Sequence, residues 1–199
     1  MTGISRRSRG AASWLCLGLA ACGGRAASGG KRPTPAPARV IPLASAIVLE
    51  TAGPPPSDTA VTFVAGGRQV VVLRHGPPEN LVFAEVTFAA NTFHADSGRP
   101  VNVEIRPRPG VYGIDLVTSA PFSEGVSVVF KYPRFFSAPA KARAVYGSDV
   151  LYERALAIGQ LVADGQSLAL LPSTRPASDN LQAALPGPGT YLVAAPESP

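Results

Sequence analysis

Glycine and proline divide this sequence into short segments, and that division limits what it can fold into. The chain of 199 residues contains 20 glycines and 21 prolines. From Val40 onward, apolar or alternating runs rich in Val, Phe and Tyr end at a Gly or Pro roughly every ten residues. Proline lacks the amide donor that a strand interior needs, and glycine favours turns. This spacing predicts an all-β domain built from many short strands.

Several runs alternate with a period of two, as expected for strands with one buried face. In Val101–Ile105, the three aliphatic side chains are predicted to face the core, while Asn102 and Glu104 face water. In Leu81–Phe88, the apolar face contains every second residue from Val82 onward. The predicted strands of the first half are Val40–Glu50, Thr59–Val64, Gln69–Leu73, Leu81–Phe88, Val101–Ile105, Tyr112–Thr118 and Val126–Tyr132.

Two glycine-containing turns are predicted to join neighbouring strands as hairpins. Gly66-Gly67 separates the second and third predicted strands, and Asp164-Gly165 has the composition of a type I′ turn. The run from Leu151 to Val162 also fits helical spacing, but Gly159 lowers its helix propensity, so a strand is favoured. The predicted strands of the second half are Lys141–Tyr146, Leu151–Leu161, Ser167–Leu171 and Thr190–Ala195.

This number of strands predicts a two-layer antiparallel β-sandwich of the Ig-like kind, in which each sheet buries one face against the other. No internal repeat is visible in the sequence, which argues against a propeller or a solenoid. Successive apolar residues, as in Val70-Val71-Val72-Leu73, differ from the alternation expected of a membrane barrel.

The N-terminal residues have the organisation of an export signal. Three cationic residues, Arg6, Arg7 and Arg9, precede an apolar run from Ala11 to Ala21. The run of about eleven residues is shorter than the ~20 that a membrane-spanning helix needs. We therefore expect an export signal here and not a membrane span.

The end of this run, Leu19-Ala20-Ala21-Cys22, resembles a bacterial lipobox. In that lipoprotein family, a diacylglycerol is attached to the Cys sulfur and a peptidase cuts just before the Cys. The resemblance implies cleavage between Ala21 and Cys22 and a lipid anchor on Cys22. Gly23 replaces the Asp that retains enterobacterial lipoproteins in the inner membrane, so the expected location is the cell envelope, at the outer membrane.

The residues that follow the lipobox cannot form a core. They contain Gly-Gly pairs and the spaced prolines Pro33, Pro35 and Pro37, which are typical of a flexible linker. The predicted organisation is a signal peptide over residues 1–21, a flexible Gly/Pro-rich tether over residues 22–39, and a β-sandwich domain over residues 40–196.

The positive charge of the chain belongs to its N-terminal end. The formal net charge is +5, but residues 40–199 hold 11 of the 18 basic residues and all 13 acidic ones, a net of −2. A nucleic-acid-binding domain would carry a basic face of its own, so no nucleic-acid partner is expected. Cys16 lies in the signal, so Cys22 would be the sole Cys of the mature chain and no internal disulfide is expected.

A second resemblance lies in the middle of the domain, between Val82 and Tyr132. The segments Tyr112–Leu116 and Phe122–Tyr132 resemble the β-sandwich module of zonula-occludens and netrin-receptor proteins, relatives of which occur in bacterial surface lipoproteins. The resemblance implies a noncatalytic structural or interaction module, with no catalytic residues to transfer. The strands after Lys141 lie outside it.

The sequence contains no motif that identifies an enzyme. The Gly-x-Ser-x-Gly turn of serine hydrolases and the glycine-rich phosphate and dinucleotide loops are missing. His75 precedes Gly76-Pro77-Pro78 and is expected in a surface loop. His94 and Asp96 have the spacing of two metal ligands, but a third ligand is not evident, so no metal or other cofactor is expected.

Two pairs of carboxylates would suit a glycosidase only if the fold placed them across a cleft. Solvated positions at strand ends are the expectation for both. The pairs are Asp149 with Glu153, and Asp115 with Glu124.

The candidate recognition patch is the cluster Tyr132, Arg134, Phe135 and Phe136. Aromatic rings beside an arginine can stack on sugars or anchor a protein partner. The alternative interpretation is that alternate aromatic side chains fill the sandwich core, with Pro133 marking the end of a strand.

These observations predict a lipid-anchored envelope protein that is not an enzyme. Its β-sandwich would bind or scaffold another envelope component, either a protein or a polysaccharide. An exported hydrolase acting on glycans or peptides is the alternative, and it would need His75 or His94 to meet a Ser or a carboxylate in a concave site. A third possibility is a periplasmic chaperone or assembly factor that captures clients on an exposed strand edge.

Overall fold

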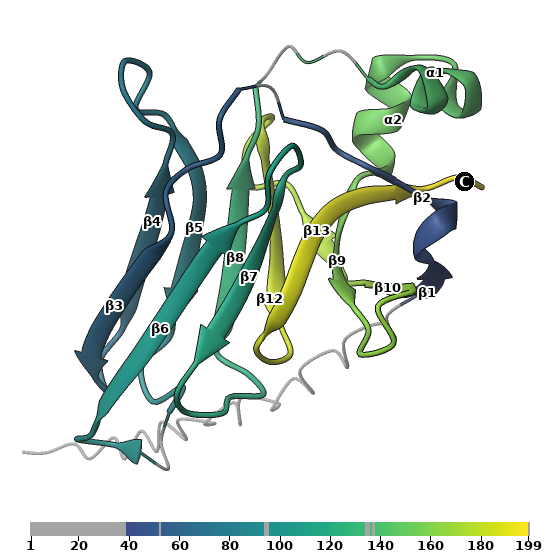
Figure 1. Cartoon of the computed structure of the whole chain (residues 1–199). Coiled ribbons are helices and arrows are strands. Elements are labelled where there is room, and N and C mark those ends of the chain that lie inside the picture. The colour runs from purple at the N-terminus through teal and green to yellow at the C-terminus, as the bar shows by residue number, and fades with distance from the viewer. Residues whose placement is uncertain (1–38, 52, 94–95, 134–135, 137, 199) are drawn as a thin grey trace, which may run out of the picture. The chain divides into compact units, whose positions relative to one another are not determined.

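Two antiparallel β-sheets pack face to face in this protein, which confirms the predicted β-sandwich (Figure 1). The structure is a computed structural model, and it describes residues 39–51, 53–93, 96–133, 136 and 138–198. The predicted signal peptide, Cys22 and the tether up to residue 38 lie outside the described residues. No helix in the described ranges has both the length and the apolar character required to cross a membrane.

The larger sheet has eight strands in the order β1-β10-β9-β13-β7-β6-β3, with β2 paired to β13 beside this path. Each pairing is antiparallel. Its strands are β1 (Arg39–Pro42), β2 (Ala46–Val48), β3 (Thr59–Val64), β6 (Pro100–Pro107), β7 (Gly113–Thr118), β9 (Ala157–Leu161), β10 (Ser167–Leu170) and β13 (Gly189–Pro196).

The smaller sheet has five strands in the order β11-β12-β8-β5-β4, also antiparallel throughout. Its outermost strands are the six-residue β4 and the two-residue β11. The strands are β4 (Gln69–Arg74), β5 (Val82–Phe88), β8 (Val126–Lys131), β11 (Ser173–Thr174) and β12 (Asn180–Leu185).

The main core lies between the two sheets and contains the inward-facing side chains of both. Val101, Val103 and Ile105 are buried on β6, while Asn102 is exposed, as the alternation predicts. Burying such apolar surface is the dominant favourable contribution to folding, at roughly 25 cal/mol per Å². The largest fully buried side chains are Tyr152, Tyr191, Phe83, Phe88 and Phe130.

A register shift in β5 buries Phe83 as well as its neighbour. Ala84 lies opposite Leu73 of β4, but Val82 lies opposite Arg74, so Phe83 faces no residue of β4. An extra residue in one strand bends it and redirects side chains. Phe83 and Ala84 are consecutive and both fully buried. Phe83 was not part of the predicted apolar face, and this β-bulge is the reason that it enters the core.

Five strands of the larger sheet curl around a second, smaller core. β1 pairs with β10 and β2 pairs with β13, yet β1 and β2 are joined only by the 3-10 helix Leu43–Ser45. The strip β1-β10-β9-β13-β2 is therefore curled but not closed by strand pairing, because no ladder joins β1 to β2 among the described residues, and we call it the small barrel (Figure 1). Its buried residues are Ile41, Ala46, Leu168, Leu170, Leu192 and Ala194.

The predicted hairpin at Gly66-Gly67 is wrong. Thr59–Val64 forms β3 and pairs with β6 in the larger sheet, while β4 pairs with β5 in the smaller sheet. The two glycines therefore form a connection between the sheets. A Gly-Gly turn fixes a change of chain direction, but it does not choose between pairing two strands and passing from one layer to the other.

The turn at Asp164-Gly165 does join two paired strands, β9 and β10, as predicted. It is not a type I′ turn, because only Gly165 has a positive φ (+68°), whereas type I′ requires positive φ at both central residues. Instead, the Asp164 carboxylate accepts hydrogen bonds from the backbone amides of Gln166 and Ser167, at 2.8 and 3.0 Å. This carboxylate fixes the loop.

Two short helices replace the strands that were predicted near residues 141–155. α1 (Ala140–Tyr146) ends at Gly147, whose φ is +73°, and α2 (Asp149–Ala155) begins after Ser148, whose hydroxyl accepts from the Leu151 amide at 3.2 Å. The predicted strand Lys141–Tyr146 is wrong. The predicted strand Leu151–Leu161 is wrong in its first half and right in its second, which forms β9.

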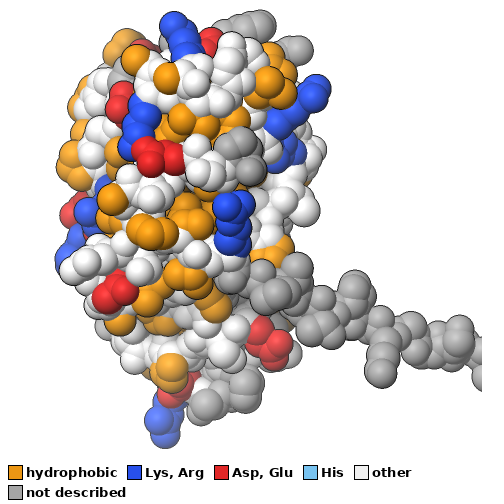
Figure 2. Space-filling view, turned by 90° about the vertical axis from the view of Figure 1, so that its right-hand side faces the viewer, with side chains coloured by type: hydrophobic (Ala, Val, Ile, Leu, Met, Phe, Trp, Pro, Cys, Tyr) orange, Lys and Arg blue, Asp and Glu red, His pale blue; other side chains and the backbone are white. Residues whose placement is uncertain are grey.

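Tyrosine side chains attach these helices to the sandwich. The Tyr152 hydroxyl donates to the Ile47 carbonyl in β2 at 3.2 Å, and the Tyr146 hydroxyl donates to the Pro196 carbonyl at the end of β13. Figure 2 shows the side of the molecule to which the small barrel and the helices belong. Charged side chains of both signs are interspersed with hydrophobic ones on this face.

Candidate functional site

One cleft among the described residues lies at the end of the sandwich where β4, β5 and β8 meet the β4–β5 loop. A cavity of about 290 Å³ is lined by side chains that include His75, Leu81, Tyr112 and Lys131. A second cavity of about 380 Å³ is lined by His75, the β4–β5 loop and the chain at Gly53. Because His75 lines both cavities, we treat them as one site and call it the His75 cleft.

Hydrogen bonds hold the loop that presents His75. The His75 amide donates to the Leu81 carbonyl at 2.9 Å, and the Asn80 amide donates to the Gly76 carbonyl at 3.3 Å. The Arg74 guanidinium also donates to the Asn80 carbonyl, at 3.3 Å. The peptide bond between Pro77 and Pro78 is cis. His75 thus lies in a surface loop, as predicted.

The floor of the cleft is aromatic. The rings of His75 and Phe83 meet edge to face at a centroid distance of 5.4 Å, and Phe83 stacks on Tyr112 at 5.2 Å with an interplanar angle of 13°. Tyr112 in turn meets Tyr132 edge to face at 6.4 Å. The β-bulge that buries Phe83 therefore also supports the imidazole. Edge-to-face and offset-stacked rings of this kind are the preferred geometries of aromatic pairs.

Charged side chains lie at the rim of the cleft. The Lys131 ammonium pairs with the Glu85 carboxylate at 2.8 Å, and both side chains are about one-third exposed. Asp179 lines the same cavity as His75, and its backbone carbonyl accepts from the Tyr132 amide at 3.0 Å. The cleft therefore combines an imidazole, an ammonium and a carboxylate over an aromatic floor.

Tyr132 remains a hydrogen-bond donor at neutral pH. Its ring is buried, and burial, reinforced by the Glu153 carboxylate, raises the pKa of its hydroxyl to about 12. The hydroxyl donates to Glu153 at 3.1 Å. Burial likewise raises the pKa of the Tyr112 hydroxyl. Neither tyrosine can serve as a general base near neutral pH, because each hydroxyl keeps its proton there.

The predicted recognition patch is divided by the structure. Tyr132 is buried in the core, and the partly buried Phe136 packs against it, edge to face on Tyr132 at 5.7 Å and on Tyr152 at 6.2 Å. Arg134 and Phe135 lie outside the described residues. Tyr132 and Pro133 nevertheless line the His75 cleft, so this part of the sequence does contribute to a concave surface.

The residues considered for catalysis do not converge among the described parts of the chain. His75 shares a cavity with Asp179, but no hydrogen bond or ion pair between the His75 ring and a described Ser or carboxylate was found there. His94 lies outside the described residues, and Asp96 is 4.0 Å from Arg99. No group of three His, Cys, Asp or Glu residues in the described ranges is placed to hold a metal ion.

Three of the carboxylates considered for glycosidase chemistry have structural partners. Asp149 accepts from the Arg143 guanidinium at 3.0 Å, and this contact lowers the pKa of its carboxyl group. Glu153 accepts from Tyr132. Asp115 accepts from Arg108, as described next, whereas Glu124 is exposed in the loop before β8.

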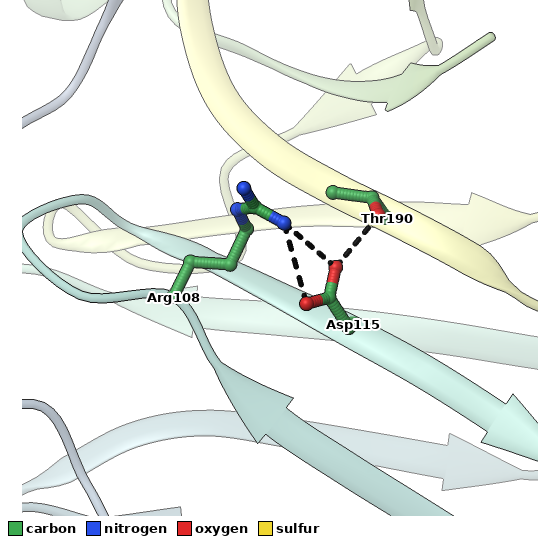
Figure 3. A network of polar contacts seen from close by, with 3 residues as sticks. All are labelled: Arg108, Asp115 and Thr190. Atoms are coloured by element: carbon green, nitrogen blue, oxygen red, sulfur yellow. Dashed lines mark hydrogen bonds and ion pairs between the residues drawn. The ribbon is translucent and has the colours of Figure 1, made fainter. Parts of the chain in front are cut away.

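A polar network joins three chain segments on the outer face of the larger sheet (Figure 3). The Arg108 guanidinium, just after β6, donates to both oxygens of Asp115 on β7 at 3.1 and 3.3 Å. The Thr190 hydroxyl on β13 donates to the same carboxylate at 2.6 Å. Because the ion pair is about 40% exposed, it contributes little stability. It makes this face polar.

A shallow hollow of about 520 Å³ lies on the same outer face, beside β3. It is lined by Thr62, Asn102, Val117 and Ser119, among others, and the Thr62 hydroxyl donates to the Asn102 side chain at 2.8 Å. Compared with the His75 cleft, this hollow offers no aromatic ring. It does border a free strand edge.

No family model, no curated protein and no solved structure matches this chain. A fixed imidazole on an aromatic floor, with one ammonium and one carboxylate at the rim, can stack on a ring or an apolar side chain and hydrogen-bond to its polar edge.

Proposed function

We propose that this protein is a lipid-anchored component of the cell envelope whose β-sandwich binds another envelope component in the His75 cleft. The bound component would be a protein or a polysaccharide, and the interaction would be noncatalytic. The lipobox-like Leu19–Cys22 and the Gly/Pro-rich residues after it support the anchor. The His75 cleft supports the binding role.

The observation that carries the binding role is the fixed, mixed surface of the cleft. His75 is supported by Phe83, and the loop that presents it is closed by backbone hydrogen bonds. Such preorganised groups bind a partner without first being ordered, which lowers the entropic cost of binding. Leu81 adds an apolar side chain that is 62% exposed at the rim of the same cavity.

The anchor is tested by replacing the residue that would carry the lipid. We expect Cys22→Ala to abolish lipidation and to move the protein out of the membrane fraction, whereas Cys16→Ala leaves its distribution unchanged. Flotation of cell membranes and mass spectrometry of the N-terminus are the measurements. Cys22→Ala protein that still floats with membranes would contradict the anchor.

The cleft is tested with a photoreactive amino acid at exposed positions of the full chain in its own envelope. We expect a crosslink from position 81 and none from position 150, since Val150 on α2 is similarly exposed (55%) but lies outside the cleft. His75→Ala should reduce the crosslink from position 81 at least severalfold. Equal crosslinking from positions 81 and 150 would count against the cleft.

One observation keeps the hydrolase alternative open. His75 and Asp179 line the same cavity, and a hydrolase would require their imidazole and carboxylate to come together there. A hydrolase would release soluble products from envelope glycans or peptides, and His75→Ala would abolish that release. The binding role instead predicts that the unsubstituted protein releases no such products and that His75→Ala loses binding only.

A further inference from the structure

β3 forms an unpaired edge of the larger sheet. It is the last strand in the order β1-β10-β9-β13-β7-β6-β3, and no described strand pairs with its other side. Its outward-facing residues Ala60, Thr62 and Val64 are exposed, and Val64 is 60% exposed. An unpaired edge presents backbone donors and acceptors that another strand can use.

The backbone groups at this edge can be assigned from the hydrogen bonds on the other side of β3. The Ala65 amide donates to the Arg99 carbonyl at 2.9 Å, toward β6. On β6, the Asn102 amide donates to the Ser119 hydroxyl and the Asn102 carbonyl accepts from the Ser119 amide, so both backbone groups of Asn102 point away from β3. In an antiparallel pair, hydrogen-bonded residues alternate along the strand. The backbone groups of Ala60, Thr62 and Val64 therefore point to the free edge.

β3 carries none of the features that usually protect an edge strand. Natural edges are blunted by charged side chains, prolines, bulges or very short strands. The six residues of β3, Thr-Ala-Val-Thr-Phe-Val, include no charge, no glycine and no proline, and their register with β6 is regular. β4, the edge of the other sheet, is preceded by Arg68, ends with Arg74 and has a register shift between Leu73 and Arg74.

We infer that β3 pairs with β3 of a second copy of this chain, in antiparallel orientation about a two-fold axis at Thr62. In this register, Thr62 lies opposite the partner's Thr62, and Ala60 lies opposite the partner's Val64. The free backbone groups of Ala60, Thr62 and Val64 then face those of Val64, Thr62 and Ala60 in the partner. Each of these three pairs can form two backbone hydrogen bonds, which gives six in total. An isologous contact of this kind closes as a dimer and consumes both edges.

The inward-facing side chains of β3 also match themselves in this register. Val61 lies opposite the partner's Phe63, and Phe63 lies opposite the partner's Val61. Both side chains are only partly buried in the single copy and pack against the main core. An aromatic residue opposite a β-branched residue is a favourable cross-strand pair. The second copy would thus cover side chains that one copy leaves half exposed.

Charge favours β3 over β4 as the self-pairing strand. The exposed Asp58 at the start of β3 would approach the end of the partner's β3, where Arg68 and Arg99 outnumber Asp96. β4 carries Arg74 within the strand itself, and a charged side chain in an edge strand opposes pairing with another strand. This inference does not depend on the anchor or on the His75 cleft.

The register is tested by a disulfide in the full chain with Cys16 and Cys22 replaced by serine. In the proposed dimer, the two residues 62 lie about 5.5 Å apart at Cα, within the range that a disulfide spans. We expect Thr62→Cys to form a disulfide-linked dimer on mild oxidation. Val117→Cys is the matched control, because it is exposed (49%) on the same face of β7. The two residues 117 would be five strand spacings, roughly 24 Å, apart.

The contribution of the edge is tested by a charge at the axis. We expect Thr62→Lys to weaken dimerisation at least tenfold in sedimentation velocity, because two lysines would meet in place of two threonines. Val117→Lys should leave dimerisation unchanged. If the chain instead associated through its N-terminal segment, both variants would still dimerise, so the comparison separates that case from pairing through β3. Circular dichroism of both variants verifies that the fold is retained.

The inference is overturned if Thr62→Cys yields no more disulfide-linked dimer than Val117→Cys, or if Thr62→Lys dimerises as tightly as the unsubstituted chain. It is also overturned if position 62 crosslinks in the envelope to a different protein and never to a second copy. That outcome would assign the edge of β3 to a client strand.

Discussion

Gly159 lies on β9, in the wall of the small barrel, where a side chain has no room. A Cβ atom added there would lie 2.5 Å from Cγ of Leu168, and Leu168 is fully buried. The sequence alone indicates only that this glycine lowers helix propensity. The structure shows a second reason for a glycine here, which is the close packing of β9 against the Leu168 side chain of β10.

We therefore expect Gly159→Ala to destabilise the protein by about 1–3 kcal/mol, the usual cost of overpacking a core. Gly67→Ala is the control, because a Cβ at Gly67 would meet nothing within 4 Å and its φ is not positive. The free energy of unfolding in urea is the measurement. Equal stability of the two variants would show that Leu168 can move aside.

Residue burial could be predicted where a strand is regular and could not where it is bulged. The period of two gave the correct inward residues of β6 because nothing interrupts its register. In β5, the same rule missed Phe83, since the extra residue opposite β4 cannot be recognised from apolar alternation alone. The aromatic floor of the His75 cleft depends on that residue.

At the scale of elements, the two short helices show that helix-cap signals were present in the sequence but were given less weight than apolar spacing. Gly147 and Ser148 are a C-terminal and an N-terminal helix cap in succession, and Asp149 follows in the first turn of α2. Apolar spacing alone favoured strands in this segment. Gly147 and Ser148 define a turn between two helices, and both residue types can be recognised as helix caps from the sequence.

We expect Ser148→Ala to destabilise the protein by about 0.5–2 kcal/mol, because α2 loses the acceptor for the Leu151 amide. Ser148→Asn should retain most of the stability, since asparagine is an equally good N-cap. Thermal unfolding followed by circular dichroism compares the two variants. A loss of equal size in both would indicate that the hydroxyl acts through another contact.

Which strands pair with one another was harder to predict from the sequence than where the strands lie. β3 and β4 were located correctly, but which strands they pair with is decided by contacts distant in the sequence, with β6 and β5. β12 was not predicted at all, because Asn-Leu-Gln-Ala-Ala-Leu has few residues that favour strands. Its buried residues Leu181, Ala183 and Leu185 do alternate, and that alternation was the available signal.

At the scale of the whole molecule, all five tyrosines of the chain are buried and have raised pKa values. Burial is the main cause in each case, and it raises the pKa to about 12 for Tyr132 and Tyr191. In the unfolded chain each hydroxyl would titrate near pH 10. The folded protein therefore binds more protons than the unfolded chain above pH 10.

We expect the free energy of unfolding to be independent of tyrosine ionisation below pH 10 and to fall as the pH rises from 10 toward 12. Tyrosinate absorbance at 295 nm should accordingly appear only above pH 10 while the protein stays folded. Tyr132→Phe should make the decline in stability shallower. Full tyrosinate absorbance at pH 10 in a protein with native circular dichroism would contradict the burial of these hydroxyls.

The cleft could be predicted only in part, because its residues come from distant segments. Tyr132 and His75 were recognised as candidates from their local sequence. Tyr112, Lys131 and Asp179 were not, since nothing in their own surroundings marks them, and the fold alone brings them together.

The short connection between β1 and β2 has a mechanical consequence. Any pull on the chain before Arg39 acts first on β1, which is held by four residue pairs with β10 and by the bond from the Leu43 amide to the Gln166 carbonyl. The small barrel has its own core, separate from the one between the sheets. Under tension, β1 would detach from β10 first and the chain would lengthen, while the main core and the His75 cleft kept their structure. The small barrel would thus absorb extension before the rest of the domain unfolds.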